Sequence, residues 1–271
     1  MVLDEAKIQK LIKEGRGQNE GSAYLPFLTV RDVSSQGFSS RPVGWKTERL
    51  HQLLSDNETA FHNIVQWAKA VVDIREQYPL LPLESTLIIA ESCGIKHPVD
   101  PMTSEPVVLT TDFLITLMHD DKRIEHARTI KPCAKLSSKR TIEKFEIERL
   151  YWNTLNIDWG IVTEKEISTV VAYNVDKIYD LFWREHLELP LEEIRDIAIT
   201  LTSIVRGKEI ALRHATQACD RRLGHDAGTS LAVAYHLIAR RYWLIDMYKP
   251  INPGEPIVLL GDNLEGFLKE G

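Results

Sequence analysis

The spacing of apolar residues divides the first part of the chain into alternating helices and strands. Apolar residues recur at the helical period from Ala60 to Ala68, and Ser55 before them is a residue type that often caps a helix. Short apolar runs bounded by polar or proline residues then predict strands. The predicted order is a helix from residue 55, a strand at 71–75, an irregular connection at 79–106, strands at 111–118 and 124–131, a helix at 140–155 and a strand at 158–163. This order predicts an α/β (α+β) domain with an αβββαβ core around a mixed sheet.

The pattern becomes mainly helical beyond a charge-mixed segment at residues 164–168. Strand-like segments at 242–247 and 257–260 enclose a turn rich in proline and glycine. Helices followed by a β-hairpin are typical of a winged helix. The sequence therefore predicts two domains, 1–165 and 166–271, of which the second is mostly helical and winged-helix-like. The helices predicted in this second domain lie at 170–184, 190–206, 208–222 and from Thr229 to about residue 241.

Composition narrows the class of protein. The chain has 271 residues, of which 44% are hydrophobic and 27% charged, as in ordinary globular domains. No apolar run is long enough to span a membrane and the N-terminal stretch lacks the apolar core of a signal peptide, so we expect a cytoplasmic protein. Its three cysteines form no CxxC pair, which argues against a disulfide framework or a zinc site.

The charge balance gives no direct sign of nucleic-acid binding. The formal net charge is −6. Residues 1–165 carry 21 Lys and Arg against 23 Asp and Glu, and the rest of the chain carries 12 against 16. A DNA-binding protein with this balance needs local basic patches or a partner. One candidate strip is the loop at 34–47 with Arg41, Trp45 and Lys46, although a solvated loop explains it as well. Arg240 and Arg241 could contact phosphates or simply face a helix dipole.

Candidate chemistry lies on the predicted hairpin of residues 111–131. Asp112 begins one strand and Lys131 ends its partner, and antiparallel pairing brings these two ends together. Metal-dependent hydrolysis of DNA needs carboxylates for Mg²⁺ and often a nearby cation. Glu58 would approach from the preceding helix. Taken alone, the residues leave an alternative open, because Ser55 and Glu58 also form a capping-box pattern and Asp112 and Lys131 could be ordinary strand-end residues.

The motif and the element order together resemble the restriction-endonuclease-like, or PD-(D/E)xK, superfamily. Several longer stretches narrow the resemblance to the TnsA family, the endonuclease subunit of heteromeric cut-and-paste (TnsABC-type) transposases. The second domain resembles that family only in its placement and helical character. The stretches are KEGRGQ (13–18), PFLTVRDV (26–33), HQLLSDNE (51–58), VVDIREQYPLLP (71–82), GIKHPV (94–99), TTDFLI (110–115), IKP (130–132) and RTIEKFEIERLYW (140–152).

The resemblance implies a site and a cofactor. Glu58, Asp112 and Lys131 match the catalytic triad of the family, with both carboxylates as ligands of Mg²⁺, for which Mn²⁺ can substitute. It further implies a backbone carbonyl ligand at Ile130. Thr129 departs from the pattern, because the superfamily has Asp or Glu there and TnsA has Gln, and a hydroxyl is a weaker ligand. Glu148 is either a supplementary carboxylate or, with its neighbours on that helix, a solvated charge.

The resemblance also implies partners. The chain is expected to cut double-stranded DNA at the 5′ ends of a transposon, while an integrase-type transposase subunit, TnsB, acts at the 3′ ends. The C-terminal domain is expected to bind the ATPase regulator TnsC or DNA, in an assembly associated with the bacterial nucleoid. Two alternatives remain from the sequence: a nuclease of the restriction or repair type that acts alone, and a catalytically inactive assembly adaptor in which Thr129 marks a lost metal site.

Overall fold

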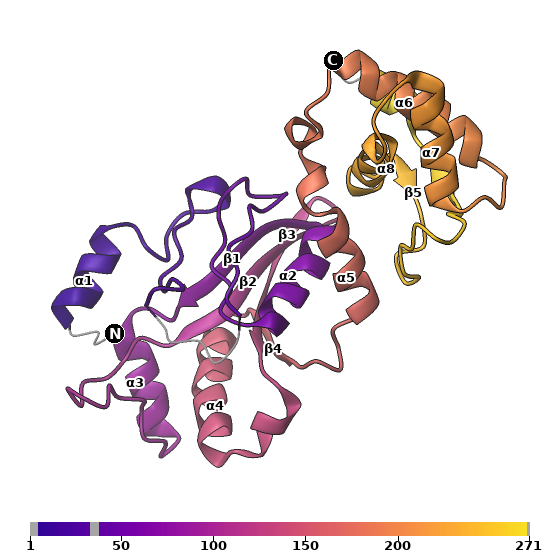
Figure 1. Ribbon diagram of the computed structural model, residues 1–271. Coiled ribbons are helices and arrows are strands. Elements are labelled where there is room, and N and C mark those ends of the chain that lie inside the picture. The colour runs from indigo at the N-terminus through magenta and orange to yellow at the C-terminus, as the bar shows by residue number, and fades with distance from the viewer. Residues whose placement is uncertain (1–4, 33–37, 270–271) are drawn as a thin grey trace. The chain divides into compact units, whose positions relative to one another are not determined.

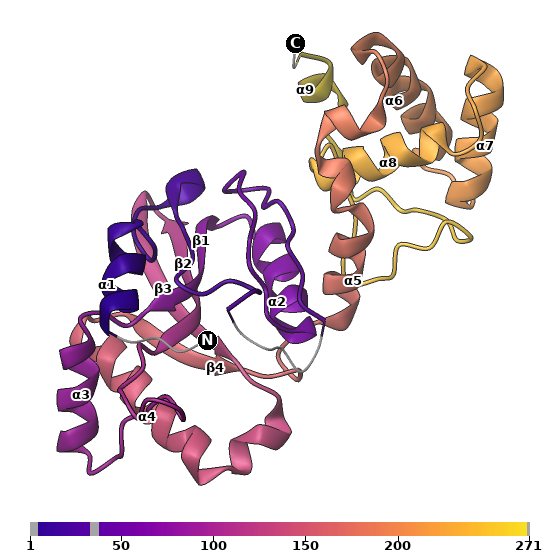
Figure 2. The same ribbon diagram turned by 60° about the vertical axis from the view of Figure 1, so that its left-hand side comes forward.

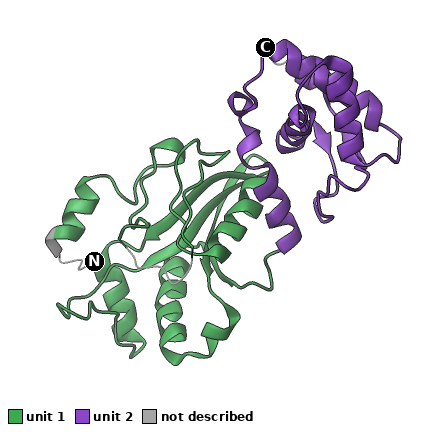
Figure 3. Cartoon of the chain, viewed as in Figure 1, with its two compact units in different colours: residues 1–167 green, residues 168–271 purple. Residues whose placement is uncertain are grey.

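The computed structural model describes residues 5–32 and 38–269. The chain forms two compact units, Met1–Ile167 and Ser168–Gly271, which are described separately (Figure 3). Within the described residues, no helix is both long and apolar enough to span a membrane. Positions 34–37 of the candidate DNA-contacting loop, and the first residues of the N-terminal stretch, lie outside the described residues.

The first unit is built on a four-stranded mixed sheet in the order β1-β2-β3-β4 (Figure 1). The first three strands pair antiparallel and β4 runs parallel to β3. The predicted mixed sheet and element order are confirmed. The elements are α1 (Glu5–Lys13), η1 (Gly21–Ala23), α2 (Asp56–Trp67), β1 (Val71–Pro79), α3 (Leu83–Ser92), β2 (Thr110–His119), β3 (Lys122–Ile130), η2 (Cys133–Ser137), α4 (Lys139–Thr154) and β4 (Asp158–Val162).

Local sequence explains the central hairpin. β2 and β3 are joined at Asp120 and Asp121, which have φ values of 47° and 58°, between the paired residues His119 and Lys122. Two left-handed residues make the tight turn that matches the twist of the flanking strands, and Asp tolerates this conformation better than most residues. The turn fixes the register of the whole hairpin.

The irregular connection expected at 79–106 is wrong for residues 83–92, which form α3. Its helical pattern is weak because exposed and buried positions are both apolar, as at Ile88, which is 66% exposed, and Ala90, which is buried. Proline breaks a helix when it lies in the interior, but Pro82 occupies the N-cap of α3, where a missing N–H costs nothing.

Helices cover both faces of the sheet (Figure 1). Val65 of α2 packs on Ile74 and Phe113 at one face, and Trp152 of α4 packs on Leu114 at the other. All of these side chains are at most 5% exposed. Burying each large apolar side chain contributes roughly 1.5–3 kcal/mol, so two cores fix the sheet between α2 and α4.

The second unit packs α6 and α7 around a central α8 (Figure 2), and it adds a short strand pair. No residue of α8 is exposed, so its sequence reads as apolar on every side. The strand predicted at 257–260 is wrong, because the pair joins Trp243–Leu244 to Gly261–Asp262. The elements are α5 (Thr169–Ile178), η3 (Asp180–Phe182), η4 (Arg184–Leu187), α6 (Leu191–Val205), α7 (Leu212–Leu223), α8 (Thr229–Ala239), β5 (Trp243–Leu244), β6 (Gly261–Asp262) and α9 (Leu264–Lys269).

Candidate active site

The candidate site lies where β2 separates from β3. The antiparallel ladder between them ends at Phe113 and Arg128, one position before Asp112 and Thr129. Beyond that point the Asp112 carboxylate accepts a hydrogen bond from the Ile130 backbone N–H at 2.6 Å. The last two residues of β3, Thr129 and Ile130, no longer pair with β2 and pair only with β4. The divergence of the two strands therefore opens room for side chains at the end of the sheet.

β1 changes face at the same place. Ile74 and Phe113 pack toward α2, whereas Tyr78 and the Thr111 hydroxyl contact Trp152 of α4. Regular alternation would have kept all of these strand residues on one side. The change occurs at Gln77, whose φ is +48°. The structure thus combines a local twist in β1 with the opening between β2 and β3.

Glu58 reaches this place from the first turn of α2. Its carboxylate is buried and accepts hydrogen bonds from the Leu54 backbone N–H and the Ser55 hydroxyl, each at 2.9 Å. The Glu58 N–H in turn donates to the Ser55 hydroxyl at 3.3 Å. Glu58 therefore does take part in a capping arrangement, as the local pattern allowed. The charge of Asp112 also raises the pKa of this carboxyl, so the cap and the site share one carboxylate.

Three predicted residues, Glu58, Asp112 and Lys131, lie close enough for their charges to affect one another's pKa values. Burial and the charge of Asp112 raise the pKa of Glu58 to about 8, against the opposing effect of Leu54, Ser55 and Lys131. Burial likewise raises the pKa of Asp112 to about 6, while the Ile130 N–H and Lys131 act to lower it. A buried carboxylate at Glu58 and a half-buried one at Asp112 repel each other, and with one lysine nearby they favour either bound protons or a bound cation.

The donor set fits a hard divalent cation. Among residues 5–32 and 38–269, no three His, Cys, Asp or Glu side chains gather as a metal cluster. Glu58 and Asp112 supply two carboxylates, and Mg²⁺ is commonly held by one or two carboxylates together with water and neutral oxygens. The predicted carbonyl ligand at Ile130 belongs to the residue whose N–H is bound by Asp112.

Thr129 lies beside Glu148. Its hydroxyl donates to the Glu148 carboxylate and accepts from the Trp159 indole N–H at 3.3 Å. Its role as a metal ligand stays a prediction, and ligation would require this hydroxyl to serve both groups or to turn. The position is buried.

Glu148 is not a solvated charge. It is 5% exposed, and its carboxylate also accepts from the Thr111 hydroxyl at 2.6 Å and from Trp159 at 3.0 Å. Burial raises the pKa of Glu148 to about 7, and the hydroxyl donors act against that rise. The interpretation of this helix face as solvated is confirmed only for neighbours such as Glu146, which pairs with exposed Arg149 at 2.7 Å. A carboxylate among so many donors ties α4 to the strands that carry the site.

A second buried polar cluster adjoins the site through Glu76. The Glu76 carboxylate accepts from two nitrogens of Arg49 at 2.9 and 2.6 Å, from His51 at 2.7 Å and from the Gln52 N–H at 2.9 Å. His51 also bonds the Thr47 hydroxyl at 2.8 Å. Since Glu76 precedes Gln77, this cluster fixes β1 immediately before its change of face.

Sequence reasoning missed Gln77 and misjudged Trp45. The available signal for Gln77 was the run of polar residues inside the strand-like segment 71–79. Trp45, part of the candidate DNA-contacting strip, is buried and packs edge-on to Trp67 at 6.4 Å between ring centroids. Its ring is therefore not available to stack on a base, although Arg41 is exposed.

Comparison with known proteins identifies one family along both units. Residues 68–164 match the family model described as TnsA-like endonuclease N terminal, and residues 166–247 match the model described as TnsA endonuclease C terminal. The chain is 38% identical over 247 residues to the Transposon Tn7 transposition protein TnsA of Escherichia coli. That similarity covers 91% of this chain and 88% of the relative.

Proposed function

The chain belongs to the TnsA family and is the endonuclease subunit of a Tn7-like transposase, and on that premise we propose that it cuts the 5′ ends of the transposon with Mg²⁺ held by Glu58 and Asp112. The observation that carries this proposal is the meeting of both carboxylates and Lys131 where β2 and β3 separate. These residues come from a helix, a strand and the residue that follows a second strand, so only the folded unit assembles them.

The roles of the residues follow from their chemistry. Glu58 and Asp112 would hold Mg²⁺, with the Ile130 carbonyl and Thr129 as further oxygen donors. When bound, the cation would supply Lewis-acid charge at the scissile phosphate. Lys131 would place its ammonium group beside the phosphate oxygens and stabilise the charge that develops there. The Ile130 N–H holds the Asp112 carboxylate in orientation by its 2.6 Å bond.

A strand-mapping experiment tests the proposal. Full-length chain, the integrase-type transposase subunit and the ATPase regulator are combined with a plasmid that carries both transposon ends, in Mg²⁺, and the nicks are mapped on each strand. We expect breaks at the 5′ ends that depend on this chain and on its partners. Robust cutting by the chain alone of a plasmid without transposon ends would instead indicate a free-standing nuclease. Unaltered 5′-end cutting without this chain would show that another subunit makes these breaks and would reject the proposal.

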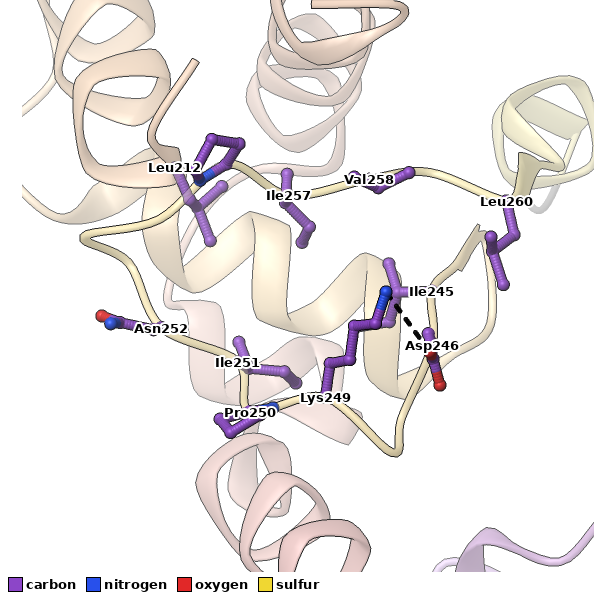
Figure 4. A pocket seen from close by; sticks show the side chains of 11 residues that line it. Leu212, Ile245, Asp246, Lys249, Pro250, Ile251, Asn252, Ile257, Val258 and Leu260 are labelled. Atoms are coloured by element: carbon purple, nitrogen blue, oxygen red, sulfur yellow. Dashed lines mark ion pairs between the residues drawn. The ribbon is translucent and has the colours of Figure 1, made fainter. Parts of the chain in front are cut away.

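We further propose that TnsB-type transposase cuts the 3′ ends and that a TnsC-type ATPase docks on the second unit. An apolar cavity of about 200 Å³ in that unit supports the docking surface (Figure 4). Val258 and Leu260 line it and are 68% and 69% exposed.

The packing of α6, α7 and α8 before a strand pair supports a winged-helix-like arrangement, but buried α8 is not a DNA-reading helix. Arg240, a candidate phosphate contact, packs its guanidinium on the Phe182 ring, 4.8 Å from the ring centroid.

Replacing Val258 with aspartate is expected to weaken binding of the ATPase regulator by about tenfold or more, because a charge would have to be buried against the partner. Binding of the purified regulator to full-length chain is measured by calorimetry. Ile199→Asp is the matched control, since Ile199 is also a partly exposed apolar residue of this unit and does not line the cavity. Equal affinity of the Val258 variant and the unaltered chain would exclude this cavity as the docking surface.

A further inference from the structure

Gln77 occupies an unusual place in the first unit. It is 2% exposed and lies within β1, yet its φ of +48° is in the left-handed region. Strand residues rarely adopt this conformation, and glutamine has no special tolerance for it. Such a backbone persists only where the surroundings impose it, and it often marks a functional position.

The surroundings do impose it. On one side, Glu76 is fixed by its bonds to Arg49, His51 and the Gln52 N–H. On the other side, Tyr78 pairs with Thr111 and stacks on Tyr24 at 6.3 Å. The Gln77 carbonyl itself accepts the Phe27 N–H at 3.3 Å. The chain is therefore held before, at and after the residue, and the left-handed step between two anchored neighbours sets the direction of the side chain.

The Gln77 side chain reaches both candidate ligands. Its amide N–H donates to the Glu58 carboxylate at 3.4 Å and also bonds Asp112, whose pKa it acts to lower. The amide oxygen accepts from the Thr110 hydroxyl at 3.4 Å. Since the hydroxyl takes the oxygen, the NH₂ group is left to face the carboxylates. Gln77 is thus a neutral donor placed between two groups of like charge.

We propose that Gln77 is a positioning residue that holds the Glu58 and Asp112 carboxylates as one divalent-cation site. This inference rests on the proposed function, because it assigns Gln77 to the same site. An NH₂ group between two carboxylates offsets their repulsion without adding charge. Each carboxylate has about four lone-pair positions, so these bonds leave room for a cation. Outer partners that orient metal ligands commonly change metal affinity by about 10–100-fold.

Binding of Mn²⁺ to the full-length chain without DNA tests this role directly. Calorimetry is expected to show about a tenfold weaker affinity for Gln77→Leu, which keeps bulk but removes the amide. Gln77→Gly is expected to bind Mn²⁺ more weakly by a similar factor, although glycine adopts a positive φ freely. Thr110→Val removes the hydroxyl that orients the amide and keeps the shape of the strand residue. We expect it to weaken the affinity for Mn²⁺ by a smaller factor.

The pair of Gln77 variants separates the two roles. If the residue served only the backbone conformation, Gln77→Gly would bind Mn²⁺ as tightly as the unaltered chain, and that result overturns the inference even if Gln77→Leu does not fold. Asp112→Asn separates this inference from the proposed function. Loss of binding in Asp112→Asn with normal binding in the Gln77 variants rejects only the role of Gln77. Normal binding in Asp112→Asn, or none in the unaltered chain, rejects the metal site itself.

Discussion

Replacing Asp112 with asparagine is expected to slow cleavage of transposon-end DNA by at least about a hundredfold, because a bound cation contributes several kcal/mol of charge stabilisation to phosphodiester cleavage. Asparagine keeps the size of the side chain and an oxygen that can accept the Ile130 N–H, which Asp112 binds at 2.6 Å. What it removes is the negative charge. The rate of 5′-strand cleavage in the reconstituted system, measured with saturating partners and DNA, reports the effect.

The hairpin turn provides the matched control for this substitution. Asp121 is exposed and has a φ of 58°, a conformation that asparagine adopts readily. Asp121→Asn removes the same charge from the same hairpin, and its cleavage rate should stay within about twofold of the unaltered chain, since exposed charges several residues apart interact weakly. Cleavage at the normal rate by Asp112→Asn would contradict the assignment of this carboxylate to the site.

Replacing Glu76 with alanine is expected to lower the free energy of unfolding of the first unit by about 3–5 kcal/mol. Its carboxylate is fully buried and meets Arg49 at 2.6 Å, and removing one partner of a buried pair leaves the other charge without compensation. His51 loses its partner as well. Urea denaturation followed by tryptophan fluorescence, fitted separately for the two units, measures the change.

Glu146→Ala is the control, because Glu146 also pairs with an arginine, Arg149 at 2.7 Å, but at the surface. We expect it to cost less than about 1 kcal/mol. An equal and small effect of both substitutions would show that the buried cluster does not hold the unit together.

The effect of Glu76 has a defined pH dependence. Burial acts to raise the pKa of Glu76, but His51 and Arg49 outweigh it and hold the pKa well below its usual range. A depressed pKa in the folded chain means that the stabilisation is present above the unfolded value of about 4.3 and disappears as the pH falls through the folded value. The difference between the unaltered chain and Glu76→Ala should therefore shrink in acid below about pH 4.

Periodicity and turn chemistry were sufficient to predict the sheet. The β2–β3 hairpin follows from two apolar runs around a polar turn, and its antiparallel pairing places Asp112 near the end of β3. Glu58 could not be placed in this way, because its local pattern predicts only a helix cap. Its approach to Asp112 depends on how α2 packs on the sheet, which no local spacing encodes, so the resemblance to the TnsA family was needed.

Other features depend on tertiary packing that no local pattern reveals. Glu148 lies among charged residues of α4 and looks solvated, yet the hydroxyls of Thr111 and Thr129 surround it. Gln77 looks like one more polar residue in a strand, because its left-handed conformation arises from neighbours that are distant in sequence. Residues 257–260 have a strand-like composition, but Ile257 and Val258 line a cavity instead of pairing.

The shared use of Glu58 as helix cap and proposed ligand bears on the order in which the protein folds and binds its cation. The Leu54 N–H and the Ser55 hydroxyl each donate to this carboxylate at 2.9 Å, so the cap is made by the chain itself. Small zinc domains, in contrast, have no folded state until their ligands meet the metal. We therefore expect the nuclease unit to be fully folded before any ion arrives. Chelation would then silence the subunit reversibly and leave it intact within the assembly.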